Sequence, residues 1–521
     1  MSGARVVLAA AKADFLERVR RYSFLFTLGL ALYFGYMATI GRLTLRVGDS
    51  RGVYNSAWIG GLLAVVGSTF ISLAGFYFVK NTLQRDTETR VGQILAATPI
   101  SRFTYILGKF ASNFAVLASM IGILALSSIV MQLVSGEDRH ILLWKLLSPF
   151  LLISIPAMAV VAALALLFET ISFLRGGFGN VAYFFLWTAI LAVPIATNSS
   201  IYDLSGLFLL RQSMISSHAA PAAENSFSLS IDAGQFKTIS TFRWEGISWT
   251  AEMVFSRLAL FVFALLLCIL AAALFDRFDP SRSYRALRAT SIPASPAIVS
   301  VPLAPPAPAI KLARLDVPAQ RFQFSAVLAA ELRLMLKGQR WWWYSIAAGL
   351  LLAPALIPNA AARGLVLAVA WIWPVLLWSS MGMREMRHQT YQVLFAVPHP
   401  LARQLPAVWL AGVLLAAVTG SGFAFRLLLE KNLPGLFAWA IGALFIPSAA
   451  LCLGVWSSSS KPFEILYTLL WYVGPMHATP MLDFMGSAPA TAATRYPLVY
   501  LALTAILFVL AVAGRKRQLL L

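Results

Sequence analysis

The residues of this chain that could carry acid/base chemistry are few and scattered. His477 with Asp483, and Asp203 or Asp232 in a long polar stretch, come nearest to an acid/base set. None of them falls in a recognisable catalytic or metal-ligand pattern, and the HExxH motif of metallopeptidases is absent. We therefore interpret all four as polar surface residues and predict that the chain is not an enzyme.

The sequence also contains no recognisable pattern of a metal or nucleotide site. The five histidines lack metal-ligand spacing, and the two cysteines, Cys268 and Cys452, lie in apolar runs where they behave as small apolar residues. The phosphate-binding pattern Gly-x-x-x-x-Gly-Lys-Ser/Thr does not occur. We predict no metal and no cofactor in this chain.

One polar segment between two apolar runs is rich in charge: residues 85–109, RDTETRVGQILAATPISRFTYILGK. Asp86 and Glu88 are expected at the start of a short helix over residues 86–96, because the free N–H groups and the positive dipole end of a helix favour carboxylates there. The segment therefore predicts a short helix outside the membrane.

The second part of this segment predicts how the short helix ends. Pro99 stops it, since the residue before a proline is pushed out of the helical region. Ser101 is suited to cap the next helix, with Arg102 and Lys109 at the membrane boundary. The product is a rigid helix across the cytoplasmic mouth, jointed to a span, and the plainer alternative is a solvated connection between two spans.

The composition predicts that the chain lies in a bilayer. Hydrophobic residues make up 59% of the 521 residues, charged residues make up 12%, and the mean hydropathy is +0.77. Apolar runs long enough to cross a hydrocarbon core of about 30 Å recur along the chain, and we count about twelve. They lie near residues 22–40, 57–79, 106–134, 142–168, 181–199, 252–275, 342–357, 364–382, 405–425, 436–456, 463–480 and 497–513.

The positions of Lys and Arg predict the orientation. Ten of them lie between residues 277 and 340, and Arg515, Lys516 and Arg517 end the last apolar run, so both termini are expected in the cytoplasm. Attraction of this face to anionic lipid accounts for the net charge of +20, and we predict no nucleic-acid partner. Trp341 to Trp343 are interpreted as an interfacial belt rather than a binding cage.

The chain divides into two similar parts. Residues 280–318, rich in Pro, Ala, Ser and Arg, predict a cytoplasmic linker between units of six spans at 1–279 and 319–521, with an external insertion at 200–251. Residues 384–408, REMRHQTYQVLFAVPHPLARQLPAV, align without a gap to residues 85–109. An amphipathic cationic stretch precedes the first span of each unit, KADFLERVRR and LAAELRLMLKGQR. We expect an all-α polytopic membrane protein with two parallel six-helix repeats and cytoplasmic interfacial and coupling helices.

The first polar segment resembles the coupling region of type-2 ATP-binding-cassette (ABC) exporter permeases. The residues that carry the resemblance are Asp86, Glu88, Leu95, Thr98, Pro99, Ser101, Arg102, Tyr105, Gly108 and Lys109. The resemblance implies a permease that couples to separate cassette ATPase subunits on its cytoplasmic face, which would hold ATP and Mg²⁺. It also implies export of an unknown substrate across a bacterial cytoplasmic (inner) membrane.

The resemblance assigns contact with the ATPase to residues of both segments. They are Asp86, Glu88, Arg90, Gln93, Leu95, Pro99, Arg102 and Lys109, and in the second copy Glu385, Gln392, Leu394, Pro398 and Arg403. The second copy departs from the pattern, because Arg387 replaces Glu88 and Val408 replaces Lys109. We therefore expect the two units to contact the partner unequally.

Two other functions remain open at this stage. A secondary active transporter with parallel six-helix repeats would carry charges in mid-membrane, whereas Lys145, Glu169, Arg257 and Glu464 fall near predicted span ends, where they can snorkel. A nontransporting membrane scaffold is the other alternative. Spans nearly free of charge suit a lipid-like or drug-like cargo, which the sequence does not identify.

Overall fold

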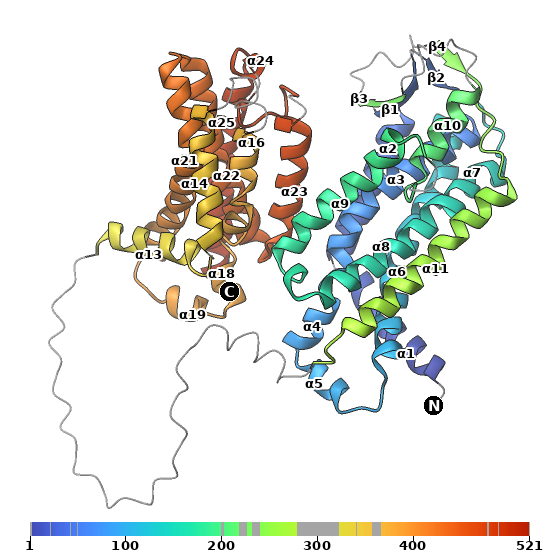
Figure 1. Cartoon of the computed structure of the whole chain (residues 1–521), viewed down its shortest axis with the longest axis horizontal. Coiled ribbons are helices and arrows are strands. Elements are labelled where there is room, and N and C mark those ends of the chain that lie inside the picture. Colours follow the sequence, from blue (N-terminus) through green and yellow to red (C-terminus); the bar gives the residue numbers. More distant parts are fainter. Residues whose placement is uncertain are drawn as a thin grey trace, which may run out of the picture. The chain divides into compact units, whose positions relative to one another are not determined.

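The computed structural model divides the chain into two compact units, Met1–Ala286 and Leu287–Leu521, each described here by itself (Figure 1). The described residues are 3–20, 22–41, 43–48, 50–199, 203–217, 227–231, 240–278, 322–339, 341–356, 366–476, 479–487 and 489–519. The predicted linker at 280–318 lies outside them.

The first unit is built from helices and four short strands. Its long helices are α1 (Gly3–Val19), α2 (Tyr22–Thr39), α3 (Ser56–Val79), α6 (Arg102–Ser135), α8 (Ile155–Thr170), α9 (Gly177–Ala196) and α11 (Ala251–Leu274). Its shorter elements are α4 (Thr82–Glu88), α5 (Val91–Ala96), α7 (Leu143–Pro149), the π-helical turn η1 (Phe150–Ser154), the 3-10 turn η2 (Ser172–Leu174) and α10 (Leu207–Ser217). Buried α3 and α8 form the centre of the unit, while little of α9 and α11 is buried, which suits both to contact with lipid.

The second unit is also built largely from helices. Its longer helices are α13 (Phe324–Leu336), α14 (Trp341–Leu356), α21 (Leu405–Leu429), α22 (Leu433–Ser457), α23 (Lys461–Trp471) and α25 (Tyr496–Leu519). Its short elements are α16 (Leu367–Ile372), α17 (Val375–Trp378), α18 (Arg384–Arg387), α19 (Tyr391–Leu394), α20 (Pro400–Arg403), η6 (Tyr472–Met476) and α24 (Pro489–Ala492). The centre is α22, against which α21 and α25 pack.

Eight helical segments within the described residues are long and apolar enough to cross a membrane, so the chain is a polytopic helical membrane protein. They are Ser56–Glu88, Arg102–Ser135, Leu143–Thr170, Gly177–Ala196, Ala251–Leu274, Pro400–Leu429, Leu433–Ser457 and Tyr496–Leu519. The other four predicted spans fall on α2, α14, α16 with α17, and α23 with η6, which are shorter or interrupted. Twelve spans therefore stay a prediction.

Prolines explain where several helices are interrupted. Pro374 separates α16 from α17, and Pro475 lies in η6. Pro149 ends α7, and a π-helical turn follows before α8 begins. Because proline has no N–H and its ring clashes with the preceding turn, the helix is broken or widened at these three positions, whereas α9 and α22 continue through Pro194 and Pro447.

A small sheet of strand order β3-β1-β2-β4 was not predicted. Its strands are β1 (Leu43–Val47), β2 (Ser50–Gly52), β3 (Phe227–Ile231) and β4 (Ser240–Phe242). β1 pairs antiparallel with β2 and β3, and β2 pairs parallel with β4. The sheet lies at the end of the first unit opposite the N-terminus and ties the 200–251 insertion to the loop after α2 (Figure 1).

The predicted helix over residues 86–96 is wrong in its boundaries. It consists of two helices, because α4 ends at Glu88 and α5 begins at Val91, with Arg90 in the left-handed region (φ 60°) between them. Asp86 therefore lies in the last turn of α4 rather than at a helix start. The predicted Ser101 cap is confirmed, since its hydroxyl accepts the Thr104 N–H at 3.1 Å and α6 begins at Arg102.

Candidate functional site

A buried carboxylate from α8 caps the first turn of α4. Glu169 accepts hydrogen bonds from the backbone N–H groups of Thr82 (2.9 Å), Leu83 (2.6 Å) and Gln84 (3.2 Å). The first N–H groups of a helix have no partner within it, and an anion there is also favoured by the helix dipole. A residue about 85 positions away along the chain therefore sets where α4 starts.

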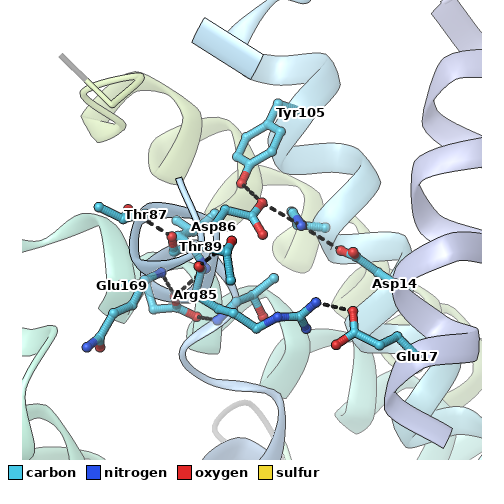
Figure 2. A network of polar contacts seen from close by, with 12 residues as sticks. Asp14, Glu17, Arg85, Asp86, Thr87, Thr89, Tyr105 and Glu169 are labelled. Atoms are coloured by element: carbon cyan, nitrogen blue, oxygen red, sulfur yellow. Dashed lines mark hydrogen bonds and ion pairs between the residues drawn. The ribbon is translucent and has the colours of Figure 1, made fainter. Parts of the chain in front are cut away.

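Asp86 joins α4 to two other helices. Its carboxylate accepts the Tyr105 hydroxyl at 2.6 Å and pairs with the Lys109 ammonium at 2.7 Å, both on α6. Lys109 also pairs with Asp14 of α1 at 2.7 Å, so one ammonium bridges two carboxylates (Figure 2). Asp86 and Lys109 are 6% and 7% exposed, so most of each side chain is enclosed by the unit itself.

Helix α1 is joined to the same place by further polar contacts. Arg85 pairs with Glu17 of α1 (Figure 2). The buried Arg18 guanidinium donates to the side-chain oxygens of Asn113 on α6 and Thr82 on α4. The cationic stretch KADFLERVRR gave no sign in the sequence that Asp14, Glu17 and Arg18 are partners of the polar segment.

The segment after this anchor is exposed. Glu88, Arg90, Gln93, Pro99 and Arg102 are exposed, and Leu95 is half-buried. Two apolar side chains of α5 also stand out, since Val91 is 42% and Ile94 is 69% exposed. Figure 1 shows α5 at the end of the unit that holds the N-terminus.

Residues that follow α11 contact this exposed segment and hold it in place. Arg277 donates to the Thr98 carbonyl at 2.6 Å, and the Phe275 ring stacks on Tyr105 with centroids 5.3 Å apart. Phe278 lies against Gly92, where an added Cβ would meet its ring at 2.7 Å. Position 92 therefore requires glycine for this contact, and α5 is held to the exit of α11.

The second unit places the equivalent acid in a similar setting. Glu385, 6% exposed, accepts the Gln404 amide N–H at 3.1 Å and pairs with the Arg515 guanidinium of α25 at 3.3 Å. Arg384 pairs with Glu331 of α13 at 3.5 Å. Burial raises the pKa of the Glu331 carboxyl above its ordinary value, and the Arg384 charge opposes that rise.

The anchors of the two units share two of their contacts. Asp86 bonds the residue 19 positions on, Tyr105, and Glu385 bonds the residue 19 positions on, Gln404. The preceding arginine pairs in each case with a glutamate of the helix before the first predicted span, α1 or α13. The neutralising cation differs, because it is Lys109 of α6 in one unit and Arg515 of α25 in the other.

The exposed part also recurs in the second unit. Gln392, Leu394 and Pro398 are exposed, and Val393, which aligns with Ile94, is 75% exposed. Arg403 is half-buried, with its guanidinium 4.8 Å from the centroid of the Phe322 ring. Of the predicted contact residues, Asp86, Lys109 and Glu385 are thus internal anchors, and most of the others present their side chains to the surroundings.

The residues weighed as catalytic prove to be buried where the structure describes them. Asp483, 1% exposed, accepts hydrogen bonds from Ser487 and from the Thr491 hydroxyl at 2.9 Å. Asp203 pairs with Arg257 at 3.2 Å and accepts the Leu209 N–H in the first turn of α10. Their interpretation as surface residues is wrong, because each organises nearby backbone. His477 and Asp232 lie outside the described residues.

The prediction that charged side chains near the span ends extend outward to the membrane surface is also wrong for three of the four residues. Glu169, Arg257 and Glu464 are 2%, 3% and 2% exposed. Only Lys145 reaches outward, where its ammonium pairs with Glu245 at 2.5 Å. Glu169 and Arg257 bond partners distant in the sequence rather than water or headgroups.

Another ionic contact of the first unit lies beside the small sheet. The Arg51 guanidinium donates twice to Glu137, at 2.7 and 3.0 Å, and the Tyr54 N–H donates to the same carboxylate at 3.0 Å. Hydrogen bonds from Arg51 hold the pKa of Glu137 below its ordinary value. This contact joins β2 to the turn after α6.

No metal site emerges from the described part of the chain. It contains no group of three His, Cys, Asp or Glu side chains able to hold an ion. Cys268 and Cys452 are buried free thiols. Comparisons with protein-family models, curated proteins and solved structures found no match to this chain.

Proposed function

We propose that this chain is the membrane-spanning permease subunit of an ABC transporter, in which two parallel six-span repeats form an export pathway. The observation that carries the proposal is the two-part construction of each polar segment. A buried acid, Asp86 or Glu385, fixes the start of the segment to neighbouring helices, and the residues that follow are exposed.

This construction suits transmission of a movement. A partner that displaces α5 also acts on α4, which packs against it, and α6 follows because Asp86 of α4 is bonded to Tyr105 and Lys109 of α6. In the second unit, a movement of α19 reaches α25 through the neighbouring α18, whose Glu385 pairs with Arg515. Packed helices with discrete ionic contacts pass on a displacement better than a solvated connector does.

The exposed face supports a protein partner. Ile94 and Val393, at aligned positions, are apolar and largely exposed on segments beyond the spans, where lipid does not account for them. Glutamate and arginine flank them, at Glu88 and Arg387. The proposed partner is a cassette ATPase subunit on the cytoplasmic face of a bacterial inner membrane, which holds ATP and Mg²⁺, with both termini of this chain on the same side.

The secondary-transporter alternative would need buried charges that bind an ion or proton. The buried Glu169 caps α4 through three N–H groups, and Arg257 is bonded to Asp203. Both groups therefore have structural duties, which favours the ABC proposal.

Affinity purification from the native membrane tests the proposed function. A tagged chain should retain a cassette ATPase, and the complex should hydrolyse ATP, whereas Ile94→Asp with Val393→Asp should release the ATPase. Met481→Asp, an exposed apolar position at the predicted external face, is the matched control and should retain it. Substrate movement by the chain alone under a proton or sodium gradient would establish the secondary transporter instead.

A further inference from the structure

An open groove of about 400 Å³ lies where α13 turns into α14. Its lining residues are Leu332, Arg333, Leu336, Lys337, Gly338 and Tyr344. Gly338 has φ +92°, a conformation that other residues rarely adopt, and an added Cβ there would meet no atom within 4 Å. The Tyr344 hydroxyl donates to the Leu336 carbonyl at 3.0 Å and holds the turn together.

The groove carries uncompensated positive charge. Arg333 and Lys337 are four residues apart on α13 and both are exposed, so the like charges repel. Among the residues that the structure describes, neither forms an ion pair, and the acidic residue of α13, Glu331, pairs with Arg384 instead. A ligand of complementary charge for this groove is therefore an anion.

The apolar surroundings indicate which anion it is. Leu332 and Leu336 line the groove beside the two cations. Trp341 is 77% exposed, Trp342 43% and Leu334 56%, and tryptophan is enriched at the depth of lipid headgroups. Apolar side chains contribute nothing to the binding of a soluble phosphate, whereas a phospholipid presents a phosphate and acyl chains together.

We propose that the α13–α14 groove binds the headgroup of an anionic phospholipid, with Arg333 and Lys337 on the phosphate and Leu332 and Leu336 against the upper acyl chain. In the first unit, Arg18 of α1 is buried and donates to Asn113, so this cation does not form a similar surface. The inference concerns the second unit alone and does not depend on the proposed permease function.

Retention of phosphatidylglycerol by the purified full chain tests this site. Native mass spectrometry in detergent, with phosphatidylglycerol or phosphatidylcholine added, should show preferential retention of the anionic lipid. Arg333→Gln with Lys337→Gln should lower this retention roughly thirtyfold, since each cation near the headgroups contributes about 1 kcal/mol and a tenfold change in affinity corresponds to about 1.4 kcal/mol. Both side chains are exposed, so the variant should fold.

Two further variants separate the groove from overall charge. Arg139→Gln with Lys431→Gln removes the same charge from exposed positions elsewhere and should retain phosphatidylglycerol. Arg333→Lys with Lys337→Arg keeps the charge and should do so too. Equal loss in the Arg139/Lys431 control, or no loss in the groove variant, would overturn the site. Displacement of the lipid by a few millimolar inorganic phosphate would show a soluble-anion site and overturn the lipid assignment.

Discussion

The two polar segments use the same acid position but neutralise it from different helices. In the first unit, Lys109 of α6 serves both Asp86 and Asp14. In the second unit, Val408 stands at the position that aligns with Lys109, and Arg515 of α25 reaches Glu385 instead. The comparison teaches that the position of the buried acid is the common feature, while the source of the cation can change without loss of the anchor.

Removal of the cation should give the largest effect and sharpen this comparison. Lys109→Met leaves the buried Asp86 and the half-buried Asp14 without their shared cation, and loss of one partner of a buried ion pair costs about 3–5 kcal/mol. Arg515→Met leaves one carboxylate, Glu385, which keeps its bond to Gln404. Thermal unfolding in detergent should therefore show a larger loss for Lys109→Met, with the exposed Arg102→Met as control. A larger loss for Arg515→Met would break the comparison.

The hydrogen bond to each acid should have a smaller effect. Tyr105→Phe removes a bond of 2.6 Å to the Asp86 carboxylate, and a hydrogen bond to a charged group contributes about 1.5–3 kcal/mol. Gln404→Leu removes the equivalent bond of 3.1 Å, and we expect a smaller loss from it because the bond is longer. The same unfolding assay measures both. Equal stability of Tyr105→Phe and the unmodified chain would contradict the anchoring role of Asp86.

Glu331 of α13 should make the stability of the chain depend on pH. Because the folded-state pKa of Glu331 is raised above the unfolded value of about 4.3, its contribution to stability falls as pH rises through the window between the two values. Glu331→Gln should remove this decline. Glu137→Gln is the opposite control, because the lowered pKa of Glu137 gives stability that is lost as pH falls below the ordinary glutamate range. Unfolding temperatures against pH measure both, and an unchanged profile for Glu331→Gln would contradict the assignment.

The exposed positions should have the smallest effect on stability. Glu88→Arg and Arg387→Glu, at aligned positions of opposite charge, should each change the free energy of unfolding by about 0.5 kcal/mol or less. Retention of the ATPase should nevertheless fall, and by different amounts, because the two units present opposite charges there. Identical losses would contradict the expected inequality of the two contacts.

The sequence predicted those features that depend on neighbouring residues. Hydropathy located the helices, and Ser101 and Pro99 predicted the junction before α6. The boundaries of α4 could not be predicted, because Glu169 of α8 caps it from a distant part of the chain. For the same reason Asp86 looked like an exposed helix start, although Tyr105 and Lys109 bury it. The sheet was missed because its short strands come from residues 43–52 and 227–242.

Site-specific photocrosslinking tests the central claim most directly. A photoreactive phenylalanine analogue placed at Ile94, and separately at Val393, should crosslink in native membranes to a cassette ATPase, and mass spectrometry should identify that protein. The same analogue at Met481 should not. Crosslinks to an ATPase from both loop positions would support matched coupling segments in the two units. Crosslinks to lipid alone, or to an ATPase only from Met481, would contradict the account.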